Sequence, residues 1–279
     1  MKRFHSSRVL FEQRERQSRT YSWAAFLFSN VVTEIVSQTL VSVIAFVCWY
    51  YPLGLWRNAE INGELNERAG LTFLFLWSLM LLFQTVSQML MTFMPDVATG
   101  LNIANLMFML SFIFAGILVP PDALPRFWIF MYRATPLSYY MSGIMSTGLS
   151  GMRIACKAKD LVTIPAVPAN MTCGTYLEQY LAVSGGSLRN PDAVAHCQVC
   201  PYTDADVLLE YFGMRFGDRW WNWGTTMAYN GINIGLAALL CWLVSSLPEA
   251  MTIEIVIPME TDSYIDVPTK ERYKRDLEP

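Results

Sequence analysis

The chain has 279 residues, of which 53% are hydrophobic and only 15% are charged, and its net charge is −3. Soluble domains have about a quarter of their residues charged, so this shortage indicates that lipid forms part of the solvent. The slightly acidic balance makes nucleic acid a poor candidate partner, because nucleic-acid binding calls for basic surfaces. The composition therefore predicts an integral membrane protein.

The chain begins with a basic segment, residues 1–22. It lacks the apolar core of about 7 residues that a secretory signal peptide needs. Positive residues near the ends of membrane spans stay in the cytoplasm, which predicts a cytoplasmic position for this segment. Its positive residues are Lys2, Arg3, Arg8, Arg14, Arg16 and Arg19.

Four apolar stretches follow, each close to the length of about 20 residues that a helix needs to cross a bilayer. The sequence thus predicts an all-α fold with three spans in residues 23–118 and a last span in 223–245. An even number of spans returns the chain to its starting side, so the tail, residues 246–279, is also expected in the cytoplasm. The stretches run from about Trp23 to Tyr50, Leu71 to Met94, Val97 to Leu118 and Trp223 to Val244.

Polar side chains recur at helical spacing in the first three spans. Because such groups are costly in lipid, they usually face a bundle interior or an aqueous path. We expect them to line a substrate path; the alternative is that they only bond helix to helix, at about 1 kcal/mol each. They are Asn30, Glu34 and Ser37 in the first span, Gln84 and Gln88 in the second, and Asn102 and Asn105 in the third.

Glu34 is the only charged residue of the first span, and no Lys or Arg lies inside any predicted span. An ionised carboxylate at depth needs a partner. Three arrangements remain open: a position near the inner interface, protonation, or a pair with Arg19 or with another part of the protein.

The long loop, residues 119–222, is expected outside the cell. A structureless connection of this length is uncommon, so it should form a small folded subdomain. Its four cysteines predict two disulfides, with three possible connectivities. A zinc site that uses His196 is the alternative interpretation. The cysteines are Cys156, Cys173, Cys197 and Cys200.

The same loop contains the sequon Asn170-Met171-Thr172, a candidate glycosylation site. A three-residue pattern is weak by itself. Its occurrence beside the four cysteines favours the outer location of the loop.

Catalytic motifs are missing from the sequence. There is no phosphate-binding loop, no nucleophile elbow and no zinc-protease helix. We therefore expect no enzyme activity, no metal and no cofactor in this chain, and we expect it to work by conformational change.

Several blocks resemble fungal pleiotropic drug resistance transporters, which are full-size ABC transporters of the G type. The similarity begins with the loop that leads into a membrane helix in that family and fades after about Pro248. The matching blocks are Leu10-Phe11-Glu12, Arg14-Glu15-Arg16, Thr20-Tyr21-Ser22-Trp23, residues 49–54 and 127–133, Thr172-Cys173-Gly174 and residues 197–200.

The resemblance implies that the chain is the last four of six helices of the second transmembrane domain, an ABC-2 type domain. The other helices and the nucleotide-binding domains, with their ATP and Mg, would lie outside it. Glu12, Arg14, Glu15 and Arg16 would couple the chain to an ATPase domain; a solvated charged helix is the alternative. The segment 123–145 would form short re-entrant helices. Val36 replaces a proline common in the family, which implies a straighter helix.

The expected function is the permease portion of an ATP-driven exporter of hydrophobic drugs or lipids in the plasma membrane. Its partners would be membrane lipid, a hydrophobic small-molecule substrate, the nucleotide-binding domains and the remaining helices. The alternatives are an inert or regulatory fragment without transport activity, and a small independent channel.

Overall fold

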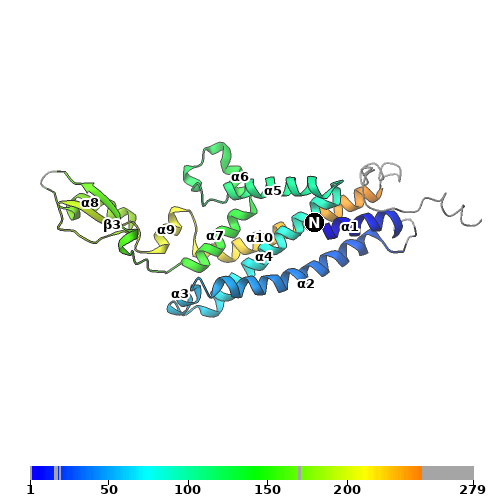
Figure 1. The fold of residues 1–279 in the computed structure, drawn as a ribbon, viewed down its shortest axis with the longest axis horizontal. Helices are drawn as coiled ribbons and strands as arrows, with labels where there is room; N and C mark the ends of the chain where they lie inside the picture. The colour runs from blue at the N-terminus through cyan, green and yellow to red at the C-terminus, as the bar shows by residue number, and fades with distance from the viewer. Residues whose placement is uncertain (1, 16–17, 19, 169–170, 247–279) are drawn as a thin grey trace, which may run out of the picture.

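The computed structural model describes residues 2–15, 18, 20–168 and 171–246. Arg16, Asn170 and the tail after residue 246 lie outside these residues. Figure 1 shows a long bundle of helices with a small subdomain that contains strands at one end. We call this end the sheet end, and we call the opposite end, where helix α1 (Lys2–Leu10) lies, the α1 end.

The bundle is built from long antiparallel helices. Among the described residues, three helical stretches are long and apolar enough to cross a membrane. A fourth apolar helix, α5, has 17 residues, which corresponds to about 25 Å. The three longest helices of the bundle are α2 (Trp23–Tyr50), α4 (Leu65–Phe93) and α10 (Arg219–Ser246). The shorter helix α5 spans Val97–Ile113.

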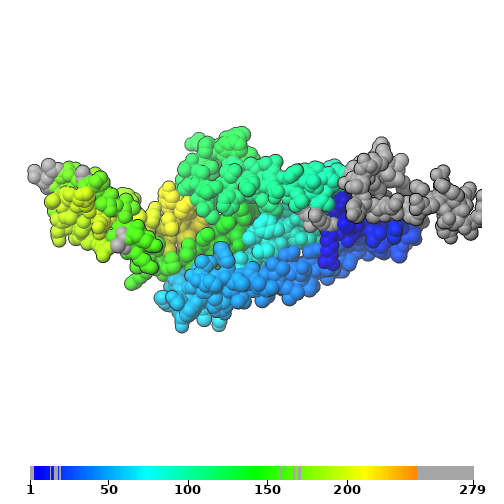
Figure 2. All heavy atoms as spheres, in the orientation of Figure 1, coloured from blue at the N-terminus to red at the C-terminus, as the bar shows by residue number. Residues whose placement is uncertain are grey.

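Helix α4 is the centre of the bundle. Figure 2 shows it between α2 on one side and α5 on the other, and it also packs on α7 (Pro136–Leu149) and α10. Phe75 is fully buried, and its ring lies where a side chain at Gly143 of α7 would stand, within 2.1 Å of the Cβ position. A glycine at this position is therefore required for α7 to approach α4.

Helix α2 runs without a break through Val36. Most of its apolar side chains are exposed, including Phe28 and Leu40. A helix of this composition is stable in contact with lipid or with other helices, not with water. After α2, the short helix α3 (Leu55–Ile61) leads into α4.

The third predicted span is shorter than expected. Helix α5 ends at Ile113, and the chain then turns at Gly116, which has a φ of 84° and lies against the ring of Tyr132. Only glycine adopts such a φ readily, so the helix cannot continue to Leu118. The following elements are η2 (Pro121–Ala123), η3 (Arg126–Trp128), α6 (Ile129–Ala134) and α7.

The subdomain at the sheet end has a three-stranded antiparallel sheet in the order β1-β3-β2. Residues Val162 and Val199 pair in the register of β1 with β3. Figure 2 shows the subdomain as a separate lobe beyond the helices. Its elements are η4 (Ala158–Asp160), β1 (Val162–Ala166), α8 (Cys173–Ser184), β2 (Ser187–Leu188) and β3 (Ala195–Cys200); α9 (Ala205–Tyr211) and η5 (Phe216–Asp218) return the chain to α10.

Candidate functional site

At the α1 end, helix α1 and the π-helical turn η1 (Phe11–Glu15) lie beside the first half of α2. Aromatic side chains form the contact: the rings of Phe11 and Phe26 stack with centroids 4.8 Å apart, and Phe4 lies 5.9 Å from Phe26. Stacked aromatic pairs add about 0.5–1.5 kcal/mol to their burial. Residues 2–15 of the predicted basic segment are therefore helical and packed against α2.

Two side chains of α1 also bond to the end of α4. Arg8 is only 4% exposed, and its Nη1 donates to the carbonyl of Met91 and, at 3.3 Å, to that of Met94. His5 Nε2 lies 3.1 Å from the carbonyl of Pro95. The last carbonyls of a helix have no partner within it and carry its negative dipole end. Arg8 therefore caps α4 from a different helix.

A small cavity adjoins Arg8. Its volume is about 10 Å³, close to the room that one water molecule needs. Thr92 and Cys241 form part of its wall. Burial lowers the pKa of Arg8 below its ordinary value, although the nearby Glu12 opposes this shift. A single water in this cavity would bond to the buried guanidinium nitrogens that have no partner among the described residues.

Asp96 caps the next helix. Its Oδ2 accepts a hydrogen bond from the backbone N–H of Thr99 at 2.7 Å, at the first turn of α5. The Thr99 bonds hold the pKa of Asp96 below its ordinary value. The turn from α4 to α5 is thus fixed on one side by its own cap and on the other by α1.

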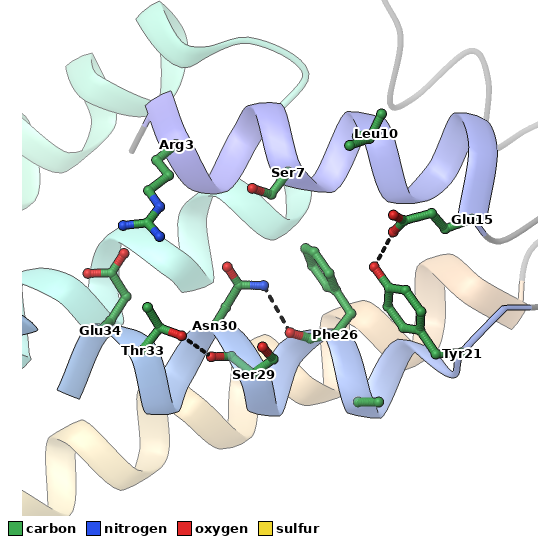
Figure 3. Close-up of a pocket in the computed structure, with 11 residues that line it drawn as sticks. Arg3, Ser7, Leu10, Glu15, Tyr21, Phe26, Ser29, Asn30, Thr33 and Glu34 are labelled. Carbon is green, nitrogen blue, oxygen red and sulfur yellow. Dashed lines mark hydrogen bonds between the residues drawn. The ribbon is translucent and has the colours of Figure 1, made fainter. Parts of the chain in front are cut away.

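A larger cleft of about 510 Å³ opens between α1 and α2. Figure 3 shows Arg3 pointing from α1 toward Glu34 of α2 at one end of it. At the other end, Tyr21 donates a hydrogen bond to Glu15, and this bond raises the pKa of Tyr21 to about 12. The cleft therefore has charged groups of both signs on facing helices.

The structure separates the residues that we expected on a substrate path. Asn30 and Glu34 line the cleft, while Ser37 lies farther along α2 and is exposed. Gln84 is half-buried on α4, and Gln88 is buried. Asn102 and Asn105 are exposed on α5. Of this set, only Asn30 and Glu34 belong to the cleft.

The predicted coupling residues also have different surroundings. Glu12 lies in the wall of the small cavity, and Arg14 is exposed. Glu15 accepts the bond from Tyr21. Arg16 lies outside the described residues, so the four residues are not described as one surface.

Buried hydrogen bonds between polar side chains join α4 and α10, which the sequence analysis did not predict. Asn230 accepts from Thr85 at 3.1 Å and donates to the carbonyl of Ser78 at 3.1 Å. Asn233 donates to Thr85 at 3.3 Å. A polar stripe in the sequence could have indicated these bonds. Its residues recur at helical spacing in α10 and are Asn222, Thr226, Asn230 and Asn233.

A cluster of charged side chains connects the helices near the sheet end of the bundle. Arg68 is buried and donates to the carbonyl of Ser150 at 2.7 Å. Its guanidinium carbon lies 4.6 Å above the ring of Phe216, and that of Arg219 lies 4.0 Å from the same ring. Arg219 also pairs with Glu67 at 2.6 Å. The cluster joins α4, α7 and α10.

The four loop cysteines form two disulfides, as the sequence predicts. Cys156 pairs with Cys200, and Cys173 with Cys197, which selects one of the three open connectivities. Within the described part of the chain, no group of His, Cys, Asp and Glu is arranged to hold a metal ion. The zinc interpretation is therefore wrong for these cysteines.

Comparison with known proteins finds related sequences over most of the chain. The family model described as ABC-2 type transporter matches residues 2–149. ABC multidrug transporter C of Aspergillus fumigatus is 42% identical over 243 residues, which are 87% of this chain and 16% of that protein.

Two further relatives are similar to the same extent. ABC-type transporter eriD of Hericium erinaceus is 42% identical over 246 residues, 87% of this chain and 17% of that protein. ZEB2-regulated ABC transporter 1 of Gibberella zeae is 41% identical over 245 residues, 88% and 16% of the two chains. The chain spans about a sixth of the length of these relatives.

Proposed function

Because the chain belongs to the ABC-2 type transporter family, we propose that it is the permease portion of an ATP-driven exporter of hydrophobic drugs or lipids. The family match over residues 2–149 carries this proposal, since it includes α1, α2, α4, α5 and α7 in one continuous block. The names of the fungal relatives support the class of activity.

We place the α1 end in the cytoplasm and the sheet end outside, at the plasma membrane. The basic residues of α1 favour an inner position, and the two disulfides favour an oxidising compartment for the sheet end. In this topology α2, α4, α5 and α10 are four spans and both termini are cytoplasmic. The outer position also leaves Asn170 as a predicted glycosylation site.

The short helices η2, η3, α6 and α7 would then lie at the outer face and partly re-enter the membrane. Irregular backbone is tolerated at that depth where protein surrounds it. Tyr132 against Gly116 and the carbonyl of Ala134 bonded by Tyr229 at 2.8 Å supply such contacts. This packing supports the re-entrant arrangement in the proposed topology.

The segment α1–η1 would pass motion between an ATPase domain and the spans. Its residues Glu12, Arg14, Glu15 and Arg16 are the proposed contact, and ATP and Mg would bind in that domain, not in this chain. The bonds from Arg8 and His5 to the end of α4 support the role, because a displacement of α1 would act directly on α4. Other helices of the exporter would complete the bundle.

The substrate path would use the polar residues of the first three spans. The exposed Asn102 and Asn105 and the half-buried Gln84 fit positions that other helices would cover. In a complete transporter, we expect Gln84→Leu or Asn102→Leu to change the relative export rates of different substrates by about threefold or more. The amount of transporter at the cell surface should stay normal. Unchanged export of a panel of hydrophobic dyes at normal surface level would contradict this role.

A chimera tests the proposal directly. The segment of Aspergillus fumigatus ABC multidrug transporter C that aligns with this chain would be replaced by the chain itself, and dye export from cells would be measured. The proposal predicts ATP-dependent export. A chimera that reaches the surface and hydrolyses ATP without exporting any dye would favour the inert fragment.

A further inference from the structure

Two opposite charges face each other across the α1–α2 cleft without forming a pair. Arg3 of α1 and Glu34 of α2 both line it, and Figure 3 shows their side chains directed toward one another. Among the described residues, neither side chain makes a hydrogen bond or an ion pair. An ionised carboxylate on a helix in lipid, such as that of Glu34, needs a partner. The geometry leaves room for a ligand that serves both groups at once.

The other polar groups of the cleft narrow the ligand class. Glu15 is already bonded by Tyr21, and the amide nitrogen of Asn30 donates to the carbonyl of Phe26 at 2.9 Å. The groups that remain are the guanidinium of Arg3, the carboxylate of Glu34, the side-chain oxygen of Asn30 and the hydroxyls of Ser7 and Ser29. Because this set contains one positive and one negative group, it favours neither a simple anion nor a simple cation. It matches a zwitterion, with its anionic part at Arg3 and its cationic part at Glu34.

Helix α2 continues from the cleft as an apolar surface. Ser37, Val41 and Ile44 follow Glu34 at helical spacing, and Val41 and Ile44 are 44% and 65% exposed. Residues three, seven and ten positions apart lie on one side of a helix. A molecule with a zwitterionic head and an apolar tail would therefore contact a single continuous surface of α1 and α2.

We propose that the cleft binds the head group of a zwitterionic phospholipid that has a primary amine. Arg3 and Ser7 bond the phosphate, Glu34 accepts from the ammonium, and the acyl chains lie along α2 beyond Ser37. A primary ammonium has N–H groups that make charge-assisted hydrogen bonds to a carboxylate, whereas a choline head group has none. The proposal requires that α2 lies in lipid, but it does not require transport.

Lipid retention by the purified full chain tests the proposal. Native mass spectrometry in detergent would compare phosphatidylethanolamine, phosphatidylcholine and phosphatidylglycerol with identical acyl chains. We expect the wild type to retain phosphatidylethanolamine about tenfold better than the other two, the factor typical of one charge-assisted hydrogen bond. Soluble glycerophosphoethanolamine should compete only at higher concentration, because it lacks the acyl chains that contact α2.

The variants separate the two ends of the head group. Glu34→Gln should remove the preference for phosphatidylethanolamine over phosphatidylcholine. Arg3→Gln should lower retention of all three lipids by about tenfold, and Arg3→Lys should restore part of it. Arg57→Gln and Glu60→Gln are matched controls, because both residues are exposed on α3 and lie outside the cleft; neither should change retention. Intact disulfides and unchanged helical circular dichroism would verify folding.

Two results would overturn the proposal. One is equal retention of phosphatidylethanolamine by the wild type, Arg3→Gln and Glu34→Gln. The other is binding of a quaternary-amine amphiphile without phosphate that depends on Glu34 and not on Arg3, which would make the cleft a site for organic cations. Neither result bears on export by the chimera, so the two proposals fail separately.

Discussion

The two ends of the molecule are held together in different ways. At the sheet end, two disulfides tie the subdomain to itself, and Cys173 and Cys197 are fully buried in its core. At the α1 end, the contact depends on aromatic rings and on bonds from Arg8 and His5 to backbone carbonyls, beside an open cleft. The sheet end is therefore covalently fixed, while the α1 end can shift without breaking a covalent bond.

The difference suggests different tasks. A covalently tied lobe keeps its shape in an oxidising compartment, where it needs no support from the bundle. A helix held by a few directed bonds to the ends of other helices can pass a displacement to them.

The largest effect is expected at the sheet end. In the double variant Cys173→Ser with Cys197→Ser, loss of the loop closure should destabilise the subdomain by about 3 kcal/mol. Limited proteolysis should then cut within residues 173–200, while the long helices stay protected. Cys48→Ser is the control, because Cys48 is a free and exposed cysteine of α2. Equal resistance of the double variant and the wild type would contradict a covalently stabilised lobe.

At the α1 end, we expect Arg8→Gln to loosen the helix by about 2 kcal/mol, the range for hydrogen bonds from a charged donor. Trp23 packs against the cluster that contains Phe4, Phe11 and Phe26. In a background variant that keeps Trp23 as the only tryptophan near α1, its fluorescence emission therefore reports on the contact between α1 and α2. Arg14→Gln should leave the emission and its thermal transition unchanged, since Arg14 is exposed. If both variants shifted the transition equally, the Arg8 bonds would have no special role.

The smallest effect is expected at Asp96. Because hydrogen bonds from Thr99 lower its pKa in the folded protein, the cap stabilises α5 at neutral pH. That contribution is lost as the pH falls through the lowered pKa, below the ordinary value of 3.8. Hydrogen exchange of the Thr99 amide should therefore accelerate, relative to its intrinsic rate, only as the pH falls below about 4. Asp96→Ala should remove this pH dependence; its persistence would assign the effect to another group.

The positions of the long helices were largely predictable from the sequence. The first expected span, from Trp23 to Tyr50, coincides with α2, and the second and fourth differ from α4 and α10 mainly in their polar first turns. Arg68 lies in the fourth position of α4 and Arg219 is the first residue of α10, and each bonds to a group of another element. Such long-range partners are not visible in local hydropathy, so the predicted helices began too late.

The candidate site was less predictable. Asn30 and Glu34 were recognised as one polar side of α2, but helical spacing does not reveal which helix faces that side. The partner is α1 with η1, which the sequence predicts only as part of a basic segment, although Phe4, Arg8 and Phe11 are buried. The disulfide pairing could not be predicted either, because it depends on the packing of α8 against β3, which brings Cys173 beside Cys197.

The central claim is that α1–η1 moves with the ATPase cycle while the subdomain at the sheet end stays fixed. Hydrogen–deuterium exchange of the export-competent chimera, with and without ATP and Mg, tests it most directly. The account predicts a nucleotide-dependent change in exchange for peptides that cover residues 2–15 and the α4–α5 turn, and no change in residues 156–200. Identical exchange of residues 2–15 in both states, in a chimera that exports dye, would contradict it.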